Sequence, residues 1–569
     1  MRKIKVALCS LILMLFAGIA SGQGAAPEAG YFDSPVDYSI TLAGSFAELR
    51  QTHFHAGIDI KPKSKTGIDT IRAAADGYVS RIKVQTGGYG QALYIDHPNG
   101  YTTVYAHLDE YTDTLTQFIR NIQRKTESYP LDIYPDSTAF YFKKGQPIGL
   151  MGNTGRSYAK HLHFEIRETE SEIPVNPAIF GLKPRDTRPP VVLSLDIHQI
   201  SPDFHEHHSS TYYPAGLKDG SYTINNGSVT FPAWTCGISV QSYDLMNGAS
   251  NRNGVFYQKT YVDDTLIHSF TLDKISFDES RYINSHVDYA QRTLNRRTLV
   301  RTFKLPGNQL SVYDSIKDNG LISLYQNKSR AVKIVLGDFD GNETEVKFNI
   351  SRANEILPPE TKPFNFKVLQ GKADTISAWG SRVIFNPRSL DRDLYITVKK
   401  EEDGFLIGNN STKLFSSVEI SLPVDFQEAD SLDQLGIWYQ EEDKWINMGG
   451  VKEDGKITTR TSALGKFTLG YDTIPPTIKV YTKGSSIVPG KKIKGILDDN
   501  IQTGGMAEEV KYAAFLDGSW IVAAYKIMTR EMEIDIPEDI PAGPHQLTIQ
   551  AIDHHGNTSE KTIKFNIGN

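Results

Sequence analysis

Cysteine is almost absent from this chain, which has 2 cysteines among 569 residues. Cys9 lies in an N-terminal apolar run, so removal of that run would leave Cys236 alone, and no internal disulfide could form. A lone cysteine also argues against a structural zinc site built from thiolates. The fold must therefore rely on hydrophobic cores and on any metal that other side chains bind, with Cys236 expected as a buried apolar residue.

An excess of positive charge is missing as well. The chain has 61 lysines and arginines against 67 aspartates and glutamates, a formal net charge of −6 at pH 7. Arg2, Lys3 and Lys5 belong to the N-terminal start, so the chain that follows is more acidic still. Because nucleic acids are bound largely through their phosphates, the composition predicts no nucleic-acid partner.

Long apolar runs are missing beyond residue 19, so we predict no transmembrane segment in the mature chain. The first run, Val6 to Ile19, follows the basic start and precedes the small residues Ala20-Ser21-Gly22. This order is the three-part pattern of a secretory signal peptide, and the run is too short for a good membrane span. We predict a signal peptide at residues 1–22, with cleavage near Gly22 or after Ala20.

The signal peptide decides the expected location. Leu8 stands directly before Cys9, where a lipoprotein signal requires a small residue, and this argues against a lipid anchor. We therefore expect a protein that is secreted through its signal peptide into the periplasm or the cell envelope.

Short runs rich in valine, isoleucine and tyrosine, separated by glycine turns, predict an all-β fold. In the first unit, residues 31–182, the runs 92–96 and 101–105 flank Asn99-Gly100, a strong hairpin signal. One helix is expected over residues 112–126. Its apolar side chains recur at i, i+3, i+4 and i+7, namely at Leu115, Phe118, Ile119 and Ile122.

Two later segments share a pair of motifs. The run Asp186 to Pro190 recurs as Asp472 to Pro476, and Asp338 to Asn342 recurs as Asp553 to Asn557. We interpret these as two diverged copies of one immunoglobulin-like β-sandwich module. The copies are predicted at residues 187–353 and 474–569, the first with a long insertion around 205–325. Residues 358–471, which begin with Pro358-Pro359, are predicted to form a further β-sandwich.

The candidate site residues all lie in the first unit, at His55, Asp59, His107, His161 and His163. In a strand, His161 and His163 would stand side by side on one face, an arrangement that a metal such as zinc explains. His55 and Asp59 could supply two further ligands. Two histidines and one carboxylate leave the fourth zinc position open for water, as in catalytic sites. A spare imidazole could then move protons or stabilise an oxyanion.

Over residues 50–180 the chain resembles the LytM/lysostaphin-type zinc metalloendopeptidases of family M23. The resemblance includes further motifs, at Ala75-Asp76-Gly77, Gly87-Gly88-Tyr89-Gly90, Lys144 to Gly149 and Gly152 to Ser157. It implies a compact antiparallel sheet of the duplicated hybrid motif type, with a groove for an extended peptide. It also implies one catalytic Zn²⁺ held by His55, Asp59 and His163, with His107 and His161 as catalytic residues that do not bind the metal.

The implied reaction is hydrolysis of peptide bonds in peptidoglycan stem peptides or cross-links, with peptidoglycan peptides as the partner. One departure from the family is an insertion between Leu108 and Lys144, where the expected helix falls. We hypothesise that the insertion borders the groove and narrows substrate choice. Deleting residues 112–138 from a protein that still folds, with no change in the cleavage pattern, would contradict this.

Two other functions remain open from the sequence. The first is a non-catalytic adaptor for the cell wall or a partner, against which the intact set of site residues argues. The second is an enzyme that acts on peptides outside the wall, which would use the same residues. The sandwich modules could be spacers, regulators, or binders of a protein or a glycan.

One glutamate in the first unit and one histidine-rich run beyond it are also interpreted. Glu165 shares the parity of His163 in the expected strand, and it either orients a metal ligand or is solvated or ion-paired. The histidine-rich run Asp203 to His208 is interpreted as an exposed polar loop.

Overall fold

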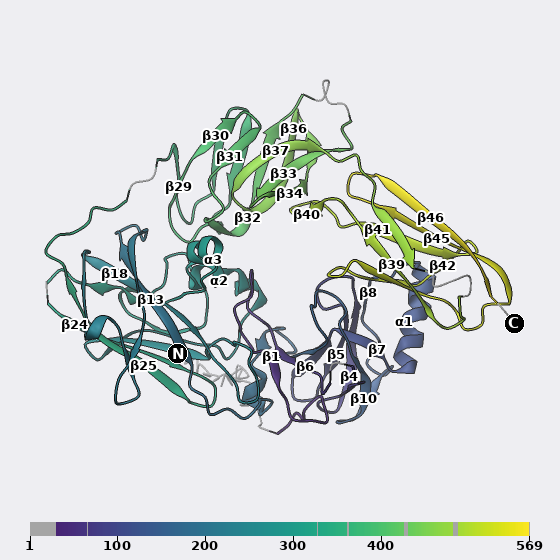
Figure 1. The fold of residues 1–569 in the computed structure, drawn as a ribbon, viewed down its shortest axis with the longest axis horizontal. Coiled ribbons are helices and arrows are strands. Elements are labelled where there is room, and N and C mark those ends of the chain that lie inside the picture. Colours follow the sequence, from purple (N-terminus) through teal and green to yellow (C-terminus); the bar gives the residue numbers. More distant parts are fainter. Residues whose placement is uncertain are drawn as a thin grey trace, which may run out of the picture.

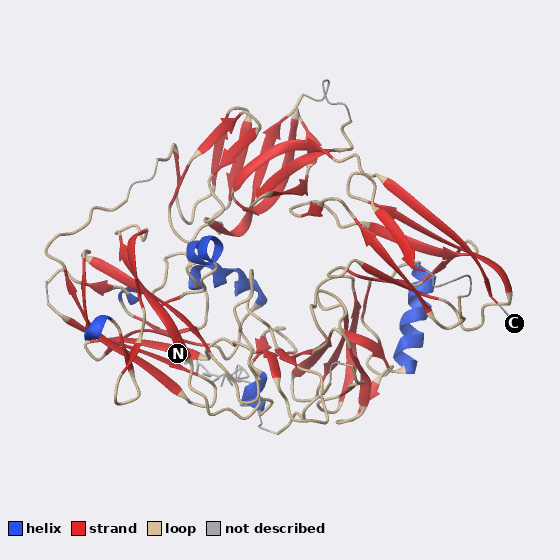
Figure 2. Ribbon diagram, viewed as in Figure 1, coloured by secondary structure: helices blue, strands red, loops and turns tan. Residues whose placement is uncertain are grey.

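The computed structural model describes residues 30–64, 66–326, 328–360, 363–425, 431–481 and 487–567. The predicted signal peptide, with Cys9, lies outside these residues. Strands dominate the described part of the chain, which confirms the predicted all-β class (Figure 2). In this part of the chain, no helix is both long and apolar enough to cross a membrane.

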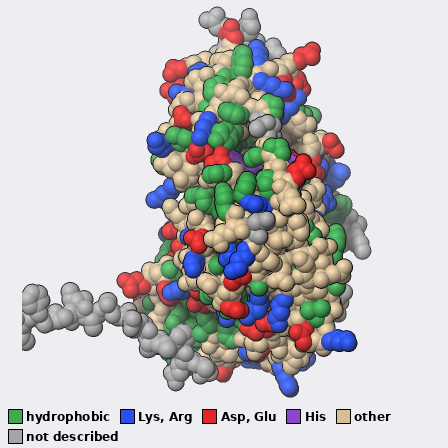
Figure 3. All heavy atoms as spheres, turned by 90° about the vertical axis from the view of Figure 1, so that its left-hand side faces the viewer, with side chains coloured by type: hydrophobic (Ala, Val, Ile, Leu, Met, Phe, Trp, Pro, Cys, Tyr) green, Lys and Arg blue, Asp and Glu red, His purple; other side chains and the backbone are tan. Residues whose placement is uncertain are grey.

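Four units follow one another around a ring (Figure 1). We name them the N-terminal unit (residues 30–182), the first sandwich (187–353), the middle sandwich (363–471) and the last sandwich (474–567). On the face that Figure 3 shows, basic and acidic side chains are intermixed, so neither sign of charge dominates there.

The N-terminal unit is built on a nine-stranded sheet in which every pairing is antiparallel. Its order is β1 (Leu42–Gly44), β2 (Ile58–Ile60), β11 (Leu162–Glu168), β6 (Tyr101–Ala106), β5 (Gln91–Asp96), β4 (Gly77–Val84) and β8 (Leu131–Ile133), with β12 (Pro174–Val175) beside β11 and β9 (Tyr141–Phe142) beside β4. A second sheet holds β3 (Thr70–Arg72), β10 (Pro147–Met151) and β7 (Leu108–Tyr111), and the 3₁₀ helix η1 spans Pro177–Phe180. Strands β5 and β6 form the hairpin predicted at Asn99-Gly100, where Gly100 has φ +82°.

The expected helix is α1 (Asp113–Thr126), which confirms the periodicity argument. Leu115 and Ile119 are buried on its inner side, and the helix ends where Glu127 adopts a left-handed conformation. The helix also touches the far end of the chain. Arg120 forms an ion pair with Asp535 of the last sandwich. Val522 of that sandwich belongs to the same apolar cluster as Leu115. These contacts close the ring.

The first sandwich packs two sheets over a common core. One sheet contains β14 (Glu206–Tyr212), β13 (Val191–Ile200), β18 (Thr235–Tyr243), β21 (Val300–Arg301) and β23 (Ile322–Ser323). The other contains β15 (Ala215–Gly216), β16 (Tyr222–Thr223), β17 (Ser228–Phe231), β25 (Glu343–Arg352), β24 (Arg330–Gly337), β19 (Tyr257–Val262), β20 (Thr265–Thr271) and β22 (Tyr313–Ile316). Its helices are α2 (Ile283–His286), α3 (Tyr289–Asn295) and the 3₁₀ helices η2 (Asn225–Gly227), η3 (Phe277–Tyr282) and η4 (Asp318–Gly320).

The interpretation of residues 203–208 as an exposed loop is wrong for its second half. Strand β14 begins at Glu206 and pairs with β13, so His207 and His208 lie in a sheet. The strand is tied to the core because Arg301, itself buried, pairs with Glu206 at 2.9 Å. A run of charged and histidine residues gave no signal of this neutralising partner, which lies 95 residues away.

The middle and last sandwiches complete the ring. The middle one contains β26 (Phe366–Val368) with β29 (Leu394–Ile396), the sheet β27 (Asp374–Ala378), β28 (Ser381–Phe385), β32 (Lys413–Pro423), β36 (Lys456–Ala463) and β35 (Val451–Glu453), and the sheet β30 (Val398–Glu401), β31 (Gly404–Ile407), β37 (Gly465–Tyr471), β33 (Leu435–Glu441) and β34 (Lys444–Gly449). The last one contains β38 (Thr477–Tyr481), β39 (Lys492–Asp498), β44 (Glu531–Asp535) and β43 (Ala523–Lys526), packed on β42 (Ser519–Ile521), β41 (Lys511–Leu516), β45 (Gly543–Ile552) and β46 (Thr558–Ile567). Strand β40 (Gln502–Thr503) leaves the last sandwich and pairs with β34, which joins the two units.

Candidate metal centre

The sheet register brings the predicted ligands together. His163 on β11 stands directly opposite Asp59 on β2 and, on its other side, opposite Ala106 at the end of β6. His107 follows Ala106 at once. His55 lies just before β2, in a segment held by a bridge between Leu49 and Phe54. Three segments that are far apart in sequence therefore meet at one end of the sheet.

The three predicted zinc ligands converge through one atom each. His55 Nε2 lies 2.9 Å from Asp59 Oδ1, and His163 Nδ1 lies 3.0 Å from the same oxygen. The two ring nitrogens are 2.9 Å apart. All three side chains are buried. Two imidazole nitrogens and one carboxylate oxygen are a donor set that suits zinc and leaves room for a further ligand.

Each of these donors has an outer partner that fixes its orientation. His55 Nδ1 donates to the backbone carbonyl of Ser45 at 2.7 Å, which leaves Nε2 for a metal. Arg50 donates to Asp59 Oδ2 at 2.7 Å, which leaves Oδ1. His163 Nε2 lies 2.7 Å from Glu165 Oε1, which leaves Nδ1.

Glu165 is fully buried and acts on the ring of His163. Burial alone would raise the pKa of Glu165, but Arg167 and His163 lower it to about 2, so the side chain is a carboxylate. Tyr89 also donates to Glu165 Oε1, at 2.6 Å. Glu165 thus contacts the ring of His163, as the orienting interpretation expected, and is also ion-paired with Arg167, whereas its burial excludes a solvated side chain.

We expect Glu165→Gln to weaken zinc binding by about 10- to 100-fold, because it removes the charge that orients His163. The change keeps the side-chain shape but leaves Arg167 without its buried partner. Zinc affinity is measured by competition with a chelating dye. Glu168→Gln, on the exposed end of the same strand, is the matched control and should bind zinc as the parent does. Equal affinities of the two variants would contradict the orienting role.

The protonation of His163 gives a second prediction. Burial alone would lower the pKa of His163, but its contacts with Asp59 and Glu165 raise it to about 9 from the ordinary 6.5. In the ion-free protein, the charged ring thus stabilises the fold below pH 6.5, and this contribution is lost as the pH rises through about 9. Because a ligand imidazole must be neutral, zinc affinity should rise about tenfold from pH 7 to pH 8. A flat affinity, measured with the same dye, would contradict this.

The two remaining histidines stand beside the ligands. His161 lies one residue before β11, with Nε2 3.4 Å from Asp59 Oδ1 and Nδ1 2.8 Å from the carbonyl of Ala159. His107 Nδ1 donates to the carbonyl of Thr154 at 2.8 Å, so its Nε2 is the free nitrogen. The two rings are 4.8 Å apart.

His107 is held in an unusual state. Its backbone has φ 60°, a left-handed conformation that is uncommon for a non-glycine residue and is found at functional sites. Burial, together with the nearby His161 and His163, lowers the pKa of His107 to about 3. Its imidazole is therefore neutral at physiological pH, and its unprotonated Nε2 can accept a hydrogen bond.

Two glycine motifs of the sequence position the backbone carbonyl that accepts the hydrogen bond from His107. Gly90 has φ +64°, and a Cβ there would lie 2.4 Å from the hydroxyl oxygen of Thr154. Gly155 has φ +75°, and a Cβ there would lie 2.3 Å from the backbone nitrogen of Gly90. Only glycine permits both the conformation and this close approach. The two loops thereby place the Thr154 carbonyl against His107.

Some supporting residues were not predicted. Arg167 follows Glu165 by two positions on β11, so the strand parity that pairs His161 with His163 could have indicated it. Ser45 and Arg50 lie in an irregular segment before β2 and gave no such signal.

The comparisons with known proteins match this part of the chain. The sequence model of peptidase family M23 matches residues 53–123 and 140–177. The DD-carboxypeptidase/endopeptidase Mpg of Neisseria meningitidis is 34% identical over 134 residues, 24% of each chain. The peptidoglycan DD-endopeptidase ShyC of Vibrio cholerae is 28% identical over 149 residues, 25% of this chain and 28% of that protein. The chain thus aligns with about a quarter of the length of these relatives.

A solved structure is similar over the same part. The catalytic domain of lysostaphin from Staphylococcus simulans covers 24% of this chain and 87% of its own, at 22% identity and a TM-score of 0.18. The unmatched residues 124–139 fall in the insertion noted in the sequence. The segment that builds the candidate metal centre, residues 53–177, therefore belongs to peptidase family M23.

Proposed function

We propose that this protein is an exported zinc metalloendopeptidase that hydrolyses peptide bonds of peptidoglycan stem peptides or cross-links. The observation that carries the proposal is the convergence of His55 Nε2, Asp59 Oδ1 and His163 Nδ1 within 3.0 Å of one another, with two further histidines at hand. The relatives Mpg and ShyC, whose names describe endopeptidases, support the reaction class, and ShyC supports the wall substrate.

Three residues would bind the metal, and their hydrogen-bond partners would orient them. His55, Asp59 and His163 would hold the zinc ion, which when bound supplies a Lewis acid that activates water and polarises the scissile carbonyl. Their outer partners, the Ser45 carbonyl, Arg50 and Glu165, keep the donor atoms aimed at one point. The set is preorganised and buried, so little rearrangement precedes metal binding.

His107 and His161 would serve the transfer of protons and the stabilisation of negative charge. His107 is neutral, and its hydrogen bond to Thr154 directs Nε2 away from that carbonyl, so Nε2 can accept a hydrogen bond from the attacking water and orient it. His161 is oriented by the Ala159 carbonyl and presents Nε2 toward the ligand carboxylate, where it can donate to a developing oxyanion.

A digest of purified cross-linked peptidoglycan tests the proposal. The mature, zinc-loaded protein is incubated with the wall material, with and without a chelator, and released muropeptides are identified by mass spectrometry. We expect a chelator-sensitive loss of cross-linked dimers, which also identifies the bond. Soluble peptides without D-amino acids serve as the second substrate. Cleavage of these alone would favour a substrate outside the wall, and no cleavage of either would favour the adaptor.

A further inference from the structure

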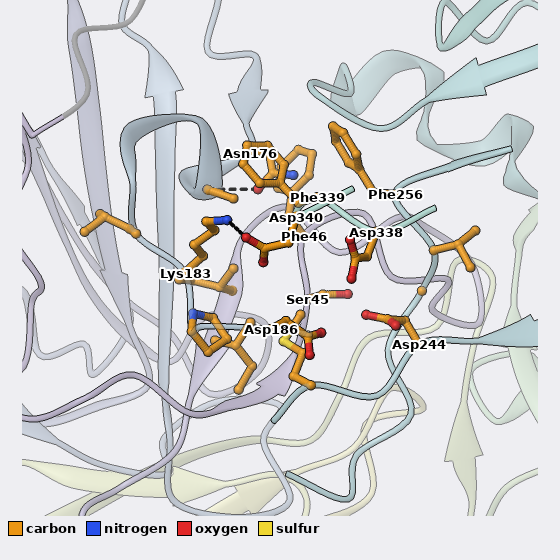
Figure 4. A pocket seen from close by; sticks show the side chains of 18 residues that line it. Ser45, Phe46, Asn176, Lys183, Asp186, Asp244, Phe256, Asp338, Phe339 and Asp340 are labelled. Carbon is orange, nitrogen blue, oxygen red and sulfur yellow. Dashed lines mark hydrogen bonds and ion pairs between the residues drawn. The ribbon is translucent and has the colours of Figure 1, made fainter. Parts of the chain in front are cut away.

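Three buried aspartates meet where the first sandwich adjoins the N-terminal unit (Figure 4). Asp186 lies in the link between the two units, Asp244 follows β18, and Asp338 follows β24. One oxygen of each lies within 4.8 Å of the others. Asp186 and Asp338 belong to the repeated motifs of the sequence, so the motifs supply two of the three carboxylates.

No basic side chain neutralises this cluster within the described ranges. Lys183, which lines the same cavity, pairs with Asp340 instead. Asp186 Oδ1 accepts from the N–H groups of Thr187 and Arg188, but its Oδ2 has no donor. Asp244 Oδ1 is also buried without a donor. Both oxygens of Asp338 accept from Asn342, but one oxygen each of Asp186 and Asp244 stays unsatisfied, which is costly in a buried place.

A neutral oxygen from the other unit points to the same place. Ser45 follows β1 of the N-terminal unit, and its side chain lines the cavity together with the three aspartates. Figure 4 shows its hydroxyl among Asp186, Asp244 and Asp338. Ser45 is 9% exposed, yet its hydroxyl has no hydrogen-bond partner. This unpartnered hydroxyl is a second observation, separate from the acidic cluster, at the same place.

When no cation is bound, repulsion among the carboxylates of the cluster destabilises the fold. Burial and the neighbouring Asp186 and Asp338 raise the pKa of Asp244 to about 7. Arg188 is the cation whose charge opposes this shift, and it makes no ion pair with Asp244. Like charges that are packed together without a counter-ion repel each other, and a bound cation would convert this repulsion into attraction.

We propose that a divalent cation of the calcium class binds between Asp186, Asp244 and Asp338, with the hydroxyl of Ser45 as a ligand from the N-terminal unit. The donors are all oxygens, which hard cations prefer, whereas zinc and the softer metals prefer nitrogen and sulfur. Calcium accepts irregular sets of carboxylate and neutral oxygens, and magnesium demands a stricter octahedron. The ion would join the two units at their seam.

Ser45 would connect this cation site to the candidate zinc centre. The backbone carbonyl of Ser45 accepts the hydrogen bond from His55 Nδ1 at 2.7 Å, while its side chain faces the aspartates. A cation that fixes Ser45 would therefore also fix the partner that orients a zinc ligand. The corresponding motifs of the last sandwich place Asp472 and Asp553 near a third carboxylate, because burial and these two neighbours raise the pKa of Asp499 to about 6.

Calcium binding to the full mature chain tests the proposal. The protein is freed of metal, reloaded with one equivalent of zinc and titrated with calcium chloride in a calorimeter. We expect binding with a Kd of about 10⁻⁴ to 10⁻³ M, the range of extracellular calcium modules. We also expect the Tm to rise by about 2–5 °C at about 10 mM calcium. No heat and no rise in Tm would overturn the proposal.

Variants locate the site. Asp244→Asn should abolish the calcium response, and without calcium it should be as stable as the parent or more so, because it relieves the repulsion. Asp340→Asn removes a carboxylate from the same cavity but leaves the three aspartates, so it should keep the response. An unchanged response of Asp244→Asn would overturn the proposal. The readout needs no peptidoglycan, so its failure would leave the proposed peptidase activity standing.

Discussion

Asp59→Ala is expected to abolish zinc binding and peptidoglycan cleavage together. Asp59 Oδ1 is the atom that both His55 Nε2 and His163 Nδ1 approach within 3.0 Å, so its removal takes away the proposed anionic ligand at the centre of the set. It also removes the 2.7 Å partner of Arg50, which keeps only its longer ion pair with Glu48, at 3.8 Å. We expect zinc content to fall from one ion per chain to background, and cleavage to fall with it.

Zinc is measured by atomic absorption after dialysis, and cleavage by the muropeptide assay. Asp136→Ala, an exposed carboxylate in the insertion of the same unit, is the control and should keep both properties. Circular dichroism shows whether each variant is folded. An Asp59→Ala protein that retains one zinc ion and full activity would refute the ligand assignment.

His107→Asn is expected to lower the cleavage rate by about 10²- to 10⁴-fold while zinc stays bound. His107 is neutral, and its Nδ1 rather than its Nε2 makes the hydrogen bond to Thr154. The three atoms proposed to bind zinc belong to His55, Asp59 and His163, so zinc should stay bound. Asparagine is chosen because it tolerates the left-handed backbone that this residue adopts, so the loop should keep its shape. His161→Ala should behave in the same way, since His161 is proposed to donate to the oxyanion.

The measurement separates kcat from zinc content in the same preparations. His53→Asn is the matched control, because His53 is an exposed histidine two residues from the proposed ligand His55. It should leave both quantities unchanged. Loss of zinc from the His107 variant would place this residue among the ligands instead, and an unchanged kcat would remove it from the reaction.

Much of the site was predictable because its geometry follows from short-range rules. The two-residue period of a strand predicted that His161 and His163 share a side, and both do approach Asp59, although His161 precedes the strand. The hairpin at Asn99-Gly100 and the helix over residues 113–126 followed from turn chemistry and from the 3.6-residue period. The domain boundaries and the roles of the site residues stay predictions.

The features that were not predicted from the sequence depend on contacts between segments that are distant along the chain. Ser45 and Arg50 act through side chains that only the fold brings near His55 and Asp59. The paired motifs around Asp186 and Asp338 were interpreted as signatures of a module, since their spacing does not reveal that the carboxylates converge. Residues 206–208 were misjudged because polarity alone cannot indicate a strand whose charge is met by Arg301.

The contacts that close the ring have a consequence for its mechanics. The ion pair of Arg120 with Asp535 is about one-third exposed on each side, so alone it contributes only about 0–1 kcal/mol. Both partners belong to one chain, however, so the contact re-forms within one molecule and does not depend on protein concentration. An interface too weak to hold two separate proteins would thus stay mostly formed here. If the contact between α1 and the last sandwich breaks, both surfaces remain in the same molecule and can form the contact again.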